Sequence, residues 1–424
     1  MDLRRRMELL TEAALPDREQ GMPKYRRSVP VGNRPITSVG EGHPRRVPLF
    51  PSSMGIAQAR VPGGGSIDLM RVMQTNACSL SCGYCPTFCG GKVPRATVTP
   101  EEVATTFMDV NRKGLAQGLF LTSGVPGRPS RAADRMLATL ELLRRREGFQ
   151  GYIHVKLLPG AETAQVEAAA ALATRVSVNL EGPSDSAVRT LAKEKDLSGD
   201  LLPKLELAGR LYRQAREEGG PGPRGSTTTQ FVVGATGERD REVLGLVARL
   251  ERQRLLHHAH FSAFQPVAGT PFENLAPTPA VREARLYQAE HLLREYGFGF
   301  DELAFGADGN LPLEHDPKTS WALANAERFP LDVTRAPLEL LLRVPGIGPK
   351  AARTIVSARR QSALRDLRDL KRVGVDTVRA GFYLTLRGRR LATAPAPHQL
   401  RLFAPGEHLT QAPFRTPVPP CAYR

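Results

Sequence analysis

The chain has 424 residues, of which 41% are hydrophobic and 24% charged, a balance typical of a soluble globular protein. It has no uninterrupted apolar run of the roughly eighteen residues that a membrane span needs, and no apolar segment follows the basic start, Met1 to Arg6. The odd count of five cysteines in so long a chain argues against a disulfide framework. We therefore expect a cytoplasmic protein with free thiols and no association with a membrane.

The positive charge is concentrated near the C-terminus. The net charge is +16, and residues 331–424 hold 17 Lys and Arg against 6 Asp and Glu. A basic segment of this kind favours a polyanionic partner, of which nucleic acid is the usual one. Solubility, or a coding bias toward arginine, would explain the same composition.

Residues 1–65 are rich in Pro, Gly and Arg and show little periodicity. They predict a loop-rich N-terminal arm, either packed on the next domain or partly disordered.

Three cysteines, Cys78, Cys82 and Cys85, are spaced as C-x3-C-x2-C directly after a predicted strand. Three thiolates so close together can bind three irons of a [4Fe–4S] cluster and leave the fourth iron open to a ligand. A zinc site would need a fourth ligand, for which Cys89 is near enough, although we expect Cys89 to be a small buried residue. A disulfide is the third alternative.

This motif, with Tyr84 before the last cysteine, resembles the signature of the radical SAM superfamily. The resemblance implies that the open iron binds S-adenosylmethionine and that one electron from the cluster splits a C–S bond of this cofactor. It also implies an electron donor such as flavodoxin or ferredoxin.

Residues 66–300 predict six alternating strands and helices, hence a partial (β/α)6 barrel of the TIM type in the α/β class. Thr99, Pro100 and Glu102 form a capping box that begins the first helix. The expected strands and helices are 67–75 with 99 onward, 118–123 with 130–146, 152–158 with 162–173, 175–180 with 183–217, 228–233 with 239–253, and 258–265 with 280–296.

Polar residues at the C-terminal ends of these strands are the candidate cofactor ligands, because barrel enzymes bind their substrates there. Asn179 and Glu181 alternate onto one face, and two such groups in a barrel interior need hydrogen-bond partners, for which ribose hydroxyls are suitable. By the resemblance, Ser123 and Gly124 bind the methionine amino group and Gly234 lies beside the adenine. Each could equally be an ordinary residue of a strand-end turn, and Lys156 is either a phosphate or carboxylate ligand or a surface lysine.

Residues 301–336 predict a linker that contains Trp321 and, at His315 and Asp316, a capped turn. Residues 337–391 predict a small all-α helix-hairpin-helix domain, since apolar positions at helical spacing flank a tight glycine turn. The backbone N–H groups of Gly346 and Gly348, with the charge of Lys350, suit a DNA phosphate. Packing or dimer contacts are the alternative use of such a hairpin.

Residues 367–379 resemble a second copy of the hairpin, and residues 392–424 form a Pro-rich tail in which we expect no role for Cys421.

Residues 66–390 resemble a bacterial family of radical SAM proteins described as acting in DNA modification or repair. The shared segments are the cysteine loop and residues 118–125, 151–156, 177–181, 316–318 and 341–348. Members tend to have extra cysteines near the N-terminus, and this chain has none before Cys78, so an auxiliary metal is not expected there. The resemblance implies a [4Fe–4S] radical SAM enzyme that abstracts hydrogen from a nucleotide in DNA.

Two other hypotheses fit the sequence. The same chemistry could act on RNA or tRNA. Alternatively, the chain is a DNA-binding adaptor whose metal site has only a structural role.

Overall fold

The computed structural model describes residues 1–14, 55–60, 65–219, 225–360 and 364–391, and it divides the chain into two compact units, Met1–Thr278 and Pro279–Arg424. The boundary lies before the end of the barrel predicted at residue 300, because the helix over residues 280–296 belongs to the second unit. The predicted tail, with Cys421, lies outside the described residues.

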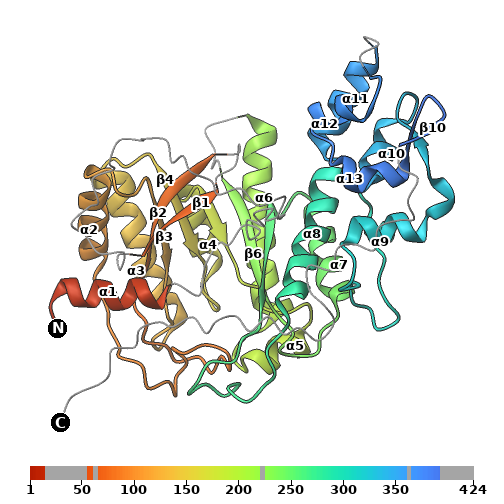
Figure 1. Ribbon diagram of the computed structural model, residues 1–424. Helices are drawn as coiled ribbons and strands as arrows, with labels where there is room; N and C mark the ends of the chain where they lie inside the picture. Colours follow the sequence, from red (N-terminus) through yellow and green to blue (C-terminus); the bar gives the residue numbers. More distant parts are fainter. Residues whose placement is uncertain (15–54, 61–64, 220–224, 361–363, 392–424) are drawn as a thin grey trace, which may run out of the picture. The chain divides into compact units, whose positions relative to one another are not determined.

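The first unit is a curled sheet of seven strands in the order β1 to β7 (Figure 1). β1 is antiparallel to β2, and β2 to β7 are parallel neighbours in chain order. The strands are β1 (Ile56–Arg60), β2 (Ser66–Met73), β3 (Gly118–Thr122), β4 (Tyr152–Lys156), β5 (Arg175–Ser177), β6 (Ser226–Val233) and β7 (His258–Ala263). The six predicted strands are therefore confirmed, and they form an open half-barrel.

Helices connect the parallel strands, as parallel pairing requires. They are α2 (Pro100–Arg112), α3 (Pro129–Glu141) continued by the π-helix Leu142–Arg146, α4 (Thr163–Leu172), α5 (Asp185–Leu191), the π-helix Leu197–Leu201, α6 (Leu202–Glu218) and α7 (Asp240–Arg252). The predicted capping box is present, because Thr99 accepts from the backbone N–H of Glu102 and the Glu102 side chain accepts from that of Thr99.

The single helix predicted over residues 183–217 is wrong. Ala192 is extended and ends α5, and Asp196 then caps the π-helix that leads into α6. Local capping side chains at Ser184 and Asp196 thus divide a segment whose apolar pattern alone indicated one helix.

The N-terminal arm contains two regular elements in its described residues, α1 (Leu3–Ala13) and β1. Arg6 forms a bidentate ion pair with Glu102 of α2, in which its two terminal nitrogens lie 2.6 and 2.9 Å from the two carboxylate oxygens. It also donates to the carbonyl of Thr97. This charged contact ties α1 to the beginning of α2.

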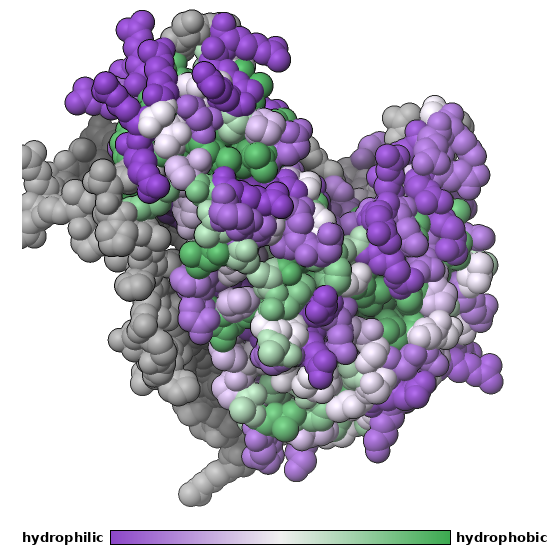
Figure 2. Space-filling view, turned by 90° about the vertical axis from the view of Figure 1, so that its right-hand side faces the viewer, coloured by the Kyte–Doolittle hydropathy of each residue, from purple (hydrophilic) through white to green (hydrophobic). Residues whose placement is uncertain are grey.

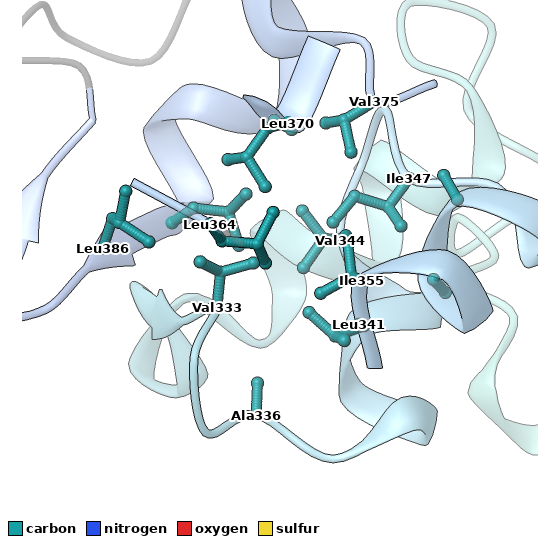
Figure 3. Close-up of a cluster of buried hydrophobic side chains, with 14 residues drawn as sticks. Val333, Ala336, Leu341, Val344, Ile347, Ile355, Leu364, Leu370, Val375 and Leu386 are labelled. Atoms are coloured by element: carbon teal, nitrogen blue, oxygen red, sulfur yellow. The ribbon is translucent and has the colours of Figure 1, made fainter. Parts of the chain in front are cut away.

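The second unit contains α8 (Ala280–Tyr296), α9 (Pro317–Ala324), α10 (Leu338–Arg343), α11 (Pro349–Arg360), α12 (Leu367–Arg372) and α13 (Thr377–Ala380), with 3-10 turns at Phe300–Glu302, Ala326–Arg328 and Gly381–Tyr383. Its core includes Leu341, Val344, Ile347, Ile355 and Leu370 (Figure 3). Pro349 begins α11 as predicted.

This unit is not all-α, in contrast to the prediction. It has a small sheet of β8 (Leu331–Asp332), β9 (Leu384–Leu386) and β10 (Arg389–Arg390). Arg387 and Gly388 both have positive φ, 52° and 79°, which is the backbone of a two-residue hairpin turn between β9 and β10. The predicted linker likewise contains α9 and β8.

One face of the protein is mainly polar. Hydrophilic side chains dominate the face shown in Figure 2, with smaller apolar areas between them. None of the described helices combines the length and the apolar character that crossing a membrane requires.

Candidate functional site

The cysteine loop connects the C-terminal end of β2 to the beginning of α2. All three motif thiols are free: Cys82 is buried, and Cys78 and Cys85 are partly exposed. Cys89 is exposed rather than buried, because it lies in a tight surface turn in which its N–H donates to the carbonyl of Leu80. The prediction that Cys89 is a buried residue is therefore wrong.

Arg95 organises the interior of this loop. Its guanidinium donates to four backbone carbonyls, those of Asn76 (2.5 Å), Thr87 (2.9 Å), Phe88 (2.8 Å) and Gly91 (3.0 Å). The fixed fork of an arginine can satisfy several acceptors at once, which a lysine cannot do in the same geometry. One side chain thus fixes the loop on both sides of Cys78, Cys82 and Cys85.

The end of β3 packs directly against the loop. The N–H of Gly124 donates to the Thr75 carbonyl at 2.7 Å, and a Cβ at Gly124 would lie 2.3 Å from the carbonyl oxygen of Ala77. Ser123 is buried, and its hydroxyl donates to the carbonyl of Gly124. Glycine at position 124 is therefore required by close approach of the two backbones, whatever its role toward a cofactor.

Two further segments hold the middle of the loop. The N–H of Gly83 donates to the carbonyl of Leu191 at the end of α5, and the Gly83 carbonyl accepts from Phe272, which follows β7. Ser81 donates from its N–H and its hydroxyl to the carboxylate of Glu194. The loop is thus held in place by segments that follow three different strands.

A buried ion pair lies beside the loop. Lys195 Nζ is 2.8 Å from Glu181 Oε1 and 3.4 Å from the hydroxyl of Tyr84, and the Lys195 and Glu181 side chains are 7% and 2% exposed. Burial alone would raise the pKa of Glu181, but the charges of Lys195 and Lys156 outweigh it and hold this pKa below its ordinary value. Glu181 is therefore an anion inside the protein.

The geometry of Glu181 is unusual in two respects. Its φ is +66°, in the left-handed region that non-glycine residues rarely adopt, and its Oε2 is buried with no close hydrogen bond among the described residues, the Tyr84 hydroxyl being its nearby polar neighbour. A buried carboxylate oxygen without a partner is costly, so this site is built to receive a donor from outside the chain.

Asn179 lies two residues before Glu181 and is partly buried. Its side-chain amide donates to Gln230 Oε1 of β6 at 3.3 Å. Lys156 ends β4 and is close enough to influence the pKa of Glu181. The structure thus brings Asn179, Glu181 and Lys156 together at one edge of the half-barrel.

Gly234 follows β6 in a left-handed conformation, with φ of +95°. A Cβ at this position would lie 1.9 Å from the hydroxyl oxygen of Thr278, and the N–H of Gly234 donates to Glu238. These contacts give a structural reason for glycine here.

The three thiols of the motif suit a [4Fe–4S] cluster, in which each thiolate binds its own iron. Among the described residues, no group of three His, Cys, Asp or Glu side chains that could hold a metal ion is found. Burial is the main cause that raises the pKa of Cys82 to about 11, and cluster binding must therefore displace a proton from this thiol.

The second unit holds the other predicted site. Gly346 has φ of +90°, and its carbonyl accepts from the N–H of Asp376 at 2.8 Å. Gly348 precedes α11, and Lys350 in the first turn of this helix is exposed. The two glycines and the lysine therefore occupy one short turn, as the sequence indicated.

Sequence analysis missed Lys195 and Arg95. Lys195 lies in a charged run, Lys193-Glu-Lys195, that reads as an exposed surface, and nothing in the run marks which lysine is buried. Arg95 gives a weak signal, because it is the one arginine of a loop, residues 74–99, that contains several small and polar residues.

Residues 72–250, which include the three motif cysteines and the strands β3 to β6, match the family model described as the Radical SAM superfamily. This part of the chain is therefore similar to that superfamily. Proteins of this superfamily use a [4Fe–4S] cluster and S-adenosylmethionine, so the cofactor prediction is confirmed at this level, and they need an electron donor.

Comparison with solved structures finds low similarities. Methylornithine synthase (PylB) has a TM-score of 0.41 and 16% identity, over 53% of this chain and 61% of its own. The hydrogenase maturase HydG from Carboxydothermus hydrogenoformans has a TM-score of 0.39 and 15% identity, over 53% of this chain and 51% of its own.

The radical SAM methyltransferase TsrM from Kitasatospora setae has a TM-score of 0.37 and 16% identity, over 61% of this chain and 50% of its own. The chain thus spans between half and about three fifths of these three proteins. No curated protein sequence matches the chain.

Proposed function

We propose that this protein is a radical SAM enzyme that modifies or repairs a nucleotide in DNA. Cys78, Cys82 and Cys85 would bind the cluster, which supplies the electron that cleaves the C–S bond of S-adenosylmethionine and so starts hydrogen abstraction from the substrate. The observation that supports the cofactor part of this proposal best is the buried Glu181 carboxylate beside the cysteine loop, whose Oε2 has no close hydrogen bond among the described residues.

The residues around the loop have separate roles in this proposal. Glu181, kept anionic by Lys195, would accept a hydrogen bond from a ribose hydroxyl, with Asn179 next to it. Ser123 and Gly124 would face the methionine amino group, and Gly234 the adenine. The ammonium of Lys195 would also attract the methionine carboxylate, while Tyr84 covers the ion pair.

The positive charge on the inner face of the half-barrel supports the proposal that the substrate is anionic. Strand alternation and register place Arg71, Lys156 and Arg175 on the face away from the apolar side chains that pack under the helices. Neither Asp nor Glu occupies an inward position of the described strands β2 to β7. A nucleotide phosphate would match this charge.

The second unit supports DNA as the carrier of that nucleotide. We propose that α10 to α13 form a paired helix-hairpin-helix in which Gly346, Gly348 and Lys350 contact a phosphate. Such contacts carry no sequence information, so binding would be largely non-specific and strongly salt-dependent. A target base in duplex would have to be unstacked to reach the barrel.

The chemistry is tested by anaerobic cluster reconstitution, reduction, addition of S-adenosylmethionine, and quantification of 5′-deoxyadenosine. We expect product from the wild type and from Cys89→Ala, the exposed thiol outside the motif, and none from Cys82→Ala. Equal product from wild type and Cys82→Ala would exclude the radical reaction and leave a DNA-binding adaptor.

The substrate is tested by measuring affinity for duplex DNA, single-stranded DNA and tRNA over a range of salt concentrations. We expect duplex DNA to bind most tightly and Lys350→Met to reduce the slope of log affinity against log salt by about 0.9, one phosphate contact. Tighter binding of tRNA would point instead to an RNA-modifying enzyme.

A further inference from the structure

Lys318 is a buried lysine in the first turn of α9, outside the sites described so far. Its side chain donates from Nζ to the carbonyl of Ile347 at 2.5 Å, and Nζ lies 4.6 Å from the ring centre of Tyr296. The residue is only 7% exposed. A lysine so deeply buried is rare unless it is paired, and here the partner is the backbone of the glycine turn between α10 and α11.

This hydrogen bond fixes a particular peptide plane. The Ile347–Gly348 bond is trans, because Phe329–Pro330 is the one cis peptide of the described residues. In a trans peptide the N–H points opposite to the carbonyl. Lys318 binds the carbonyl of this peptide, so the N–H of Gly348 points away from Lys318. That N–H has no hydrogen-bond partner among the described residues.

The same turn of α9 also holds the second hairpin. Asp316 caps α9, accepting from the N–H of Thr319 at 3.1 Å, and its other carboxylate oxygen forms an ion pair with Arg379 of α13. Arg379 also donates to the hydroxyl of Thr319 at 3.0 Å. Asp316 and Lys318, two residues apart, therefore bind one hairpin each.

The two hairpins are in direct contact as well. The N–H of Asp376 donates to the carbonyl of Gly346, and a Cβ at Gly346 would lie 2.7 Å from the carbonyl oxygen of Asp376. Gly374 in the second hairpin has the same φ as Gly346, +90°. Ile347 and Val375 from the two turns belong to one hydrophobic core (Figure 3).

We propose that the first turn of α9 is a positioning element for the polyanion site. Lys318 and Asp316 set the orientation of the two hairpins, so that the N–H of Gly348 and the charge of Lys350 face the same phosphate backbone. Neither residue touches the ligand. The ligand class, the phosphates of duplex DNA, rests on the function proposed above, while the positioning role does not.

The positioning role is tested without any ligand by hydrogen–deuterium exchange of the full-length protein. In Lys318→Met we expect peptides covering residues 344–352 to exchange roughly tenfold faster, since the loss of the buried hydrogen bond to Ile347 frees this turn. Arg379→Met should do the same for residues 373–380. Unchanged exchange in both variants would overturn the inference.

Two controls separate local from global effects. Peptides from β2 to β7 should exchange at the wild-type rate, and the fluorescence of Trp321, which is buried in α9, should show that the second unit is still folded. If Lys318→Met unfolds this unit, Arg379→Met decides alone, because the Arg379 side chain is 44% exposed and its loss leaves the core intact.

Binding to a labelled DNA duplex then distinguishes positioning from direct contact. We expect Lys318→Met to lower the affinity roughly tenfold with no change in salt slope, because no phosphate contact is lost, in contrast to Lys350→Met. A reduced slope in Lys318→Met would mean that Lys318 itself contacts the phosphate and would overturn the inference. If wild-type protein does not bind duplex DNA, the proposed function fails, and the exchange data still decide the role of α9.

Discussion

Glu181 and Lys195 form an ion pair that is almost completely removed from solvent. We predict that Lys195→Met lowers the free energy of unfolding by about 3–5 kcal/mol at pH 8, because a buried carboxylate is left without its cation. Urea denaturation followed by circular dichroism measures this change. The control is Lys193→Met, an exposed neighbour, which should cost less than about 0.5 kcal/mol.

The same variant should show a characteristic pH dependence. Without Lys195, burial raises the pKa of Glu181, so the folded state takes up a proton that the unfolded state does not hold. Stability of the variant therefore rises as pH falls, and its deficit relative to wild type should be smaller at pH 5 than at pH 8. A deficit that does not change with pH would contradict this account.

The pH dependence of stability predicted for Lys318 has the opposite sign. Burial lowers its pKa to about 7, and the nearby Asp316, Arg379 and Arg343 modify this shift only partly. Between pH 7 and the ordinary lysine value of 10.5, the unfolded state binds the proton more tightly, so this residue adds stability as pH rises. From pH 7 to pH 9 wild type should gain about 2 kcal/mol relative to Lys318→Met, measured by Trp321 fluorescence in urea.

Among the elements, the cysteine loop depends most on one side chain. Arg95 satisfies four carbonyls, and a lysine can reach fewer of them. We predict that Arg95→Lys lowers the iron content after anaerobic reconstitution by about half or more, because the loop no longer holds its thiols in place.

Lys92→Met is the matched control for this variant, since Lys92 is an exposed cation of the same loop. Its iron content should equal that of wild type. Full iron loading of Arg95→Lys would show that the cluster itself, once bound, is sufficient to order the loop.

Local signals predicted the elements that depend on local physics. The box at Thr99 and Glu102 and the start of α11 at Pro349 are present, because capping and the fixed φ of proline act within one turn. The small sheet of the second unit was missed, since β8 and β9 pair residues that lie far apart in the chain. The division between α5 and α6 was missed because the apolar pattern continues across it, although Asp196 caps the second segment locally.

In the candidate site, too, only the residues that a local sequence pattern marks could be predicted. Spacing alone indicated Cys78, Cys82 and Cys85, and alternation indicated Asn179 and Glu181, of which Asn179 donates to Gln230. Lys195 could not be found in this way, because its burial results from where α5 ends and how the loop of Tyr84 packs against it.

At the scale of the whole molecule, the two units have separate hydrophobic cores, with the cluster around Leu341 confined to the second unit. Trp321, the one tryptophan of the chain, reports on this unit only. We predict that urea unfolding followed by Trp321 fluorescence and by circular dichroism gives different midpoints.

Cofactor binding provides the control, because a ligand stabilises only the unit that binds it. S-adenosylmethionine added to the reconstituted protein should shift the transition seen by circular dichroism and leave the fluorescence transition unchanged. Coincident transitions that shift together would show that the units unfold as one.

The strand order runs from β1 to β7, and within the described residues these two outer strands do not pair with each other. The interior of a closed β-barrel can be reached only through its two ends, so a long polymer would have to pass through the barrel lengthwise. If the substrate is the DNA proposed above, a sheet that is not closed between β1 and β7 would let one nucleotide of a continuous polymer enter laterally while both flanks remain outside. Shielding of the reactive intermediate from water would then depend on the bound polymer as well as on the protein.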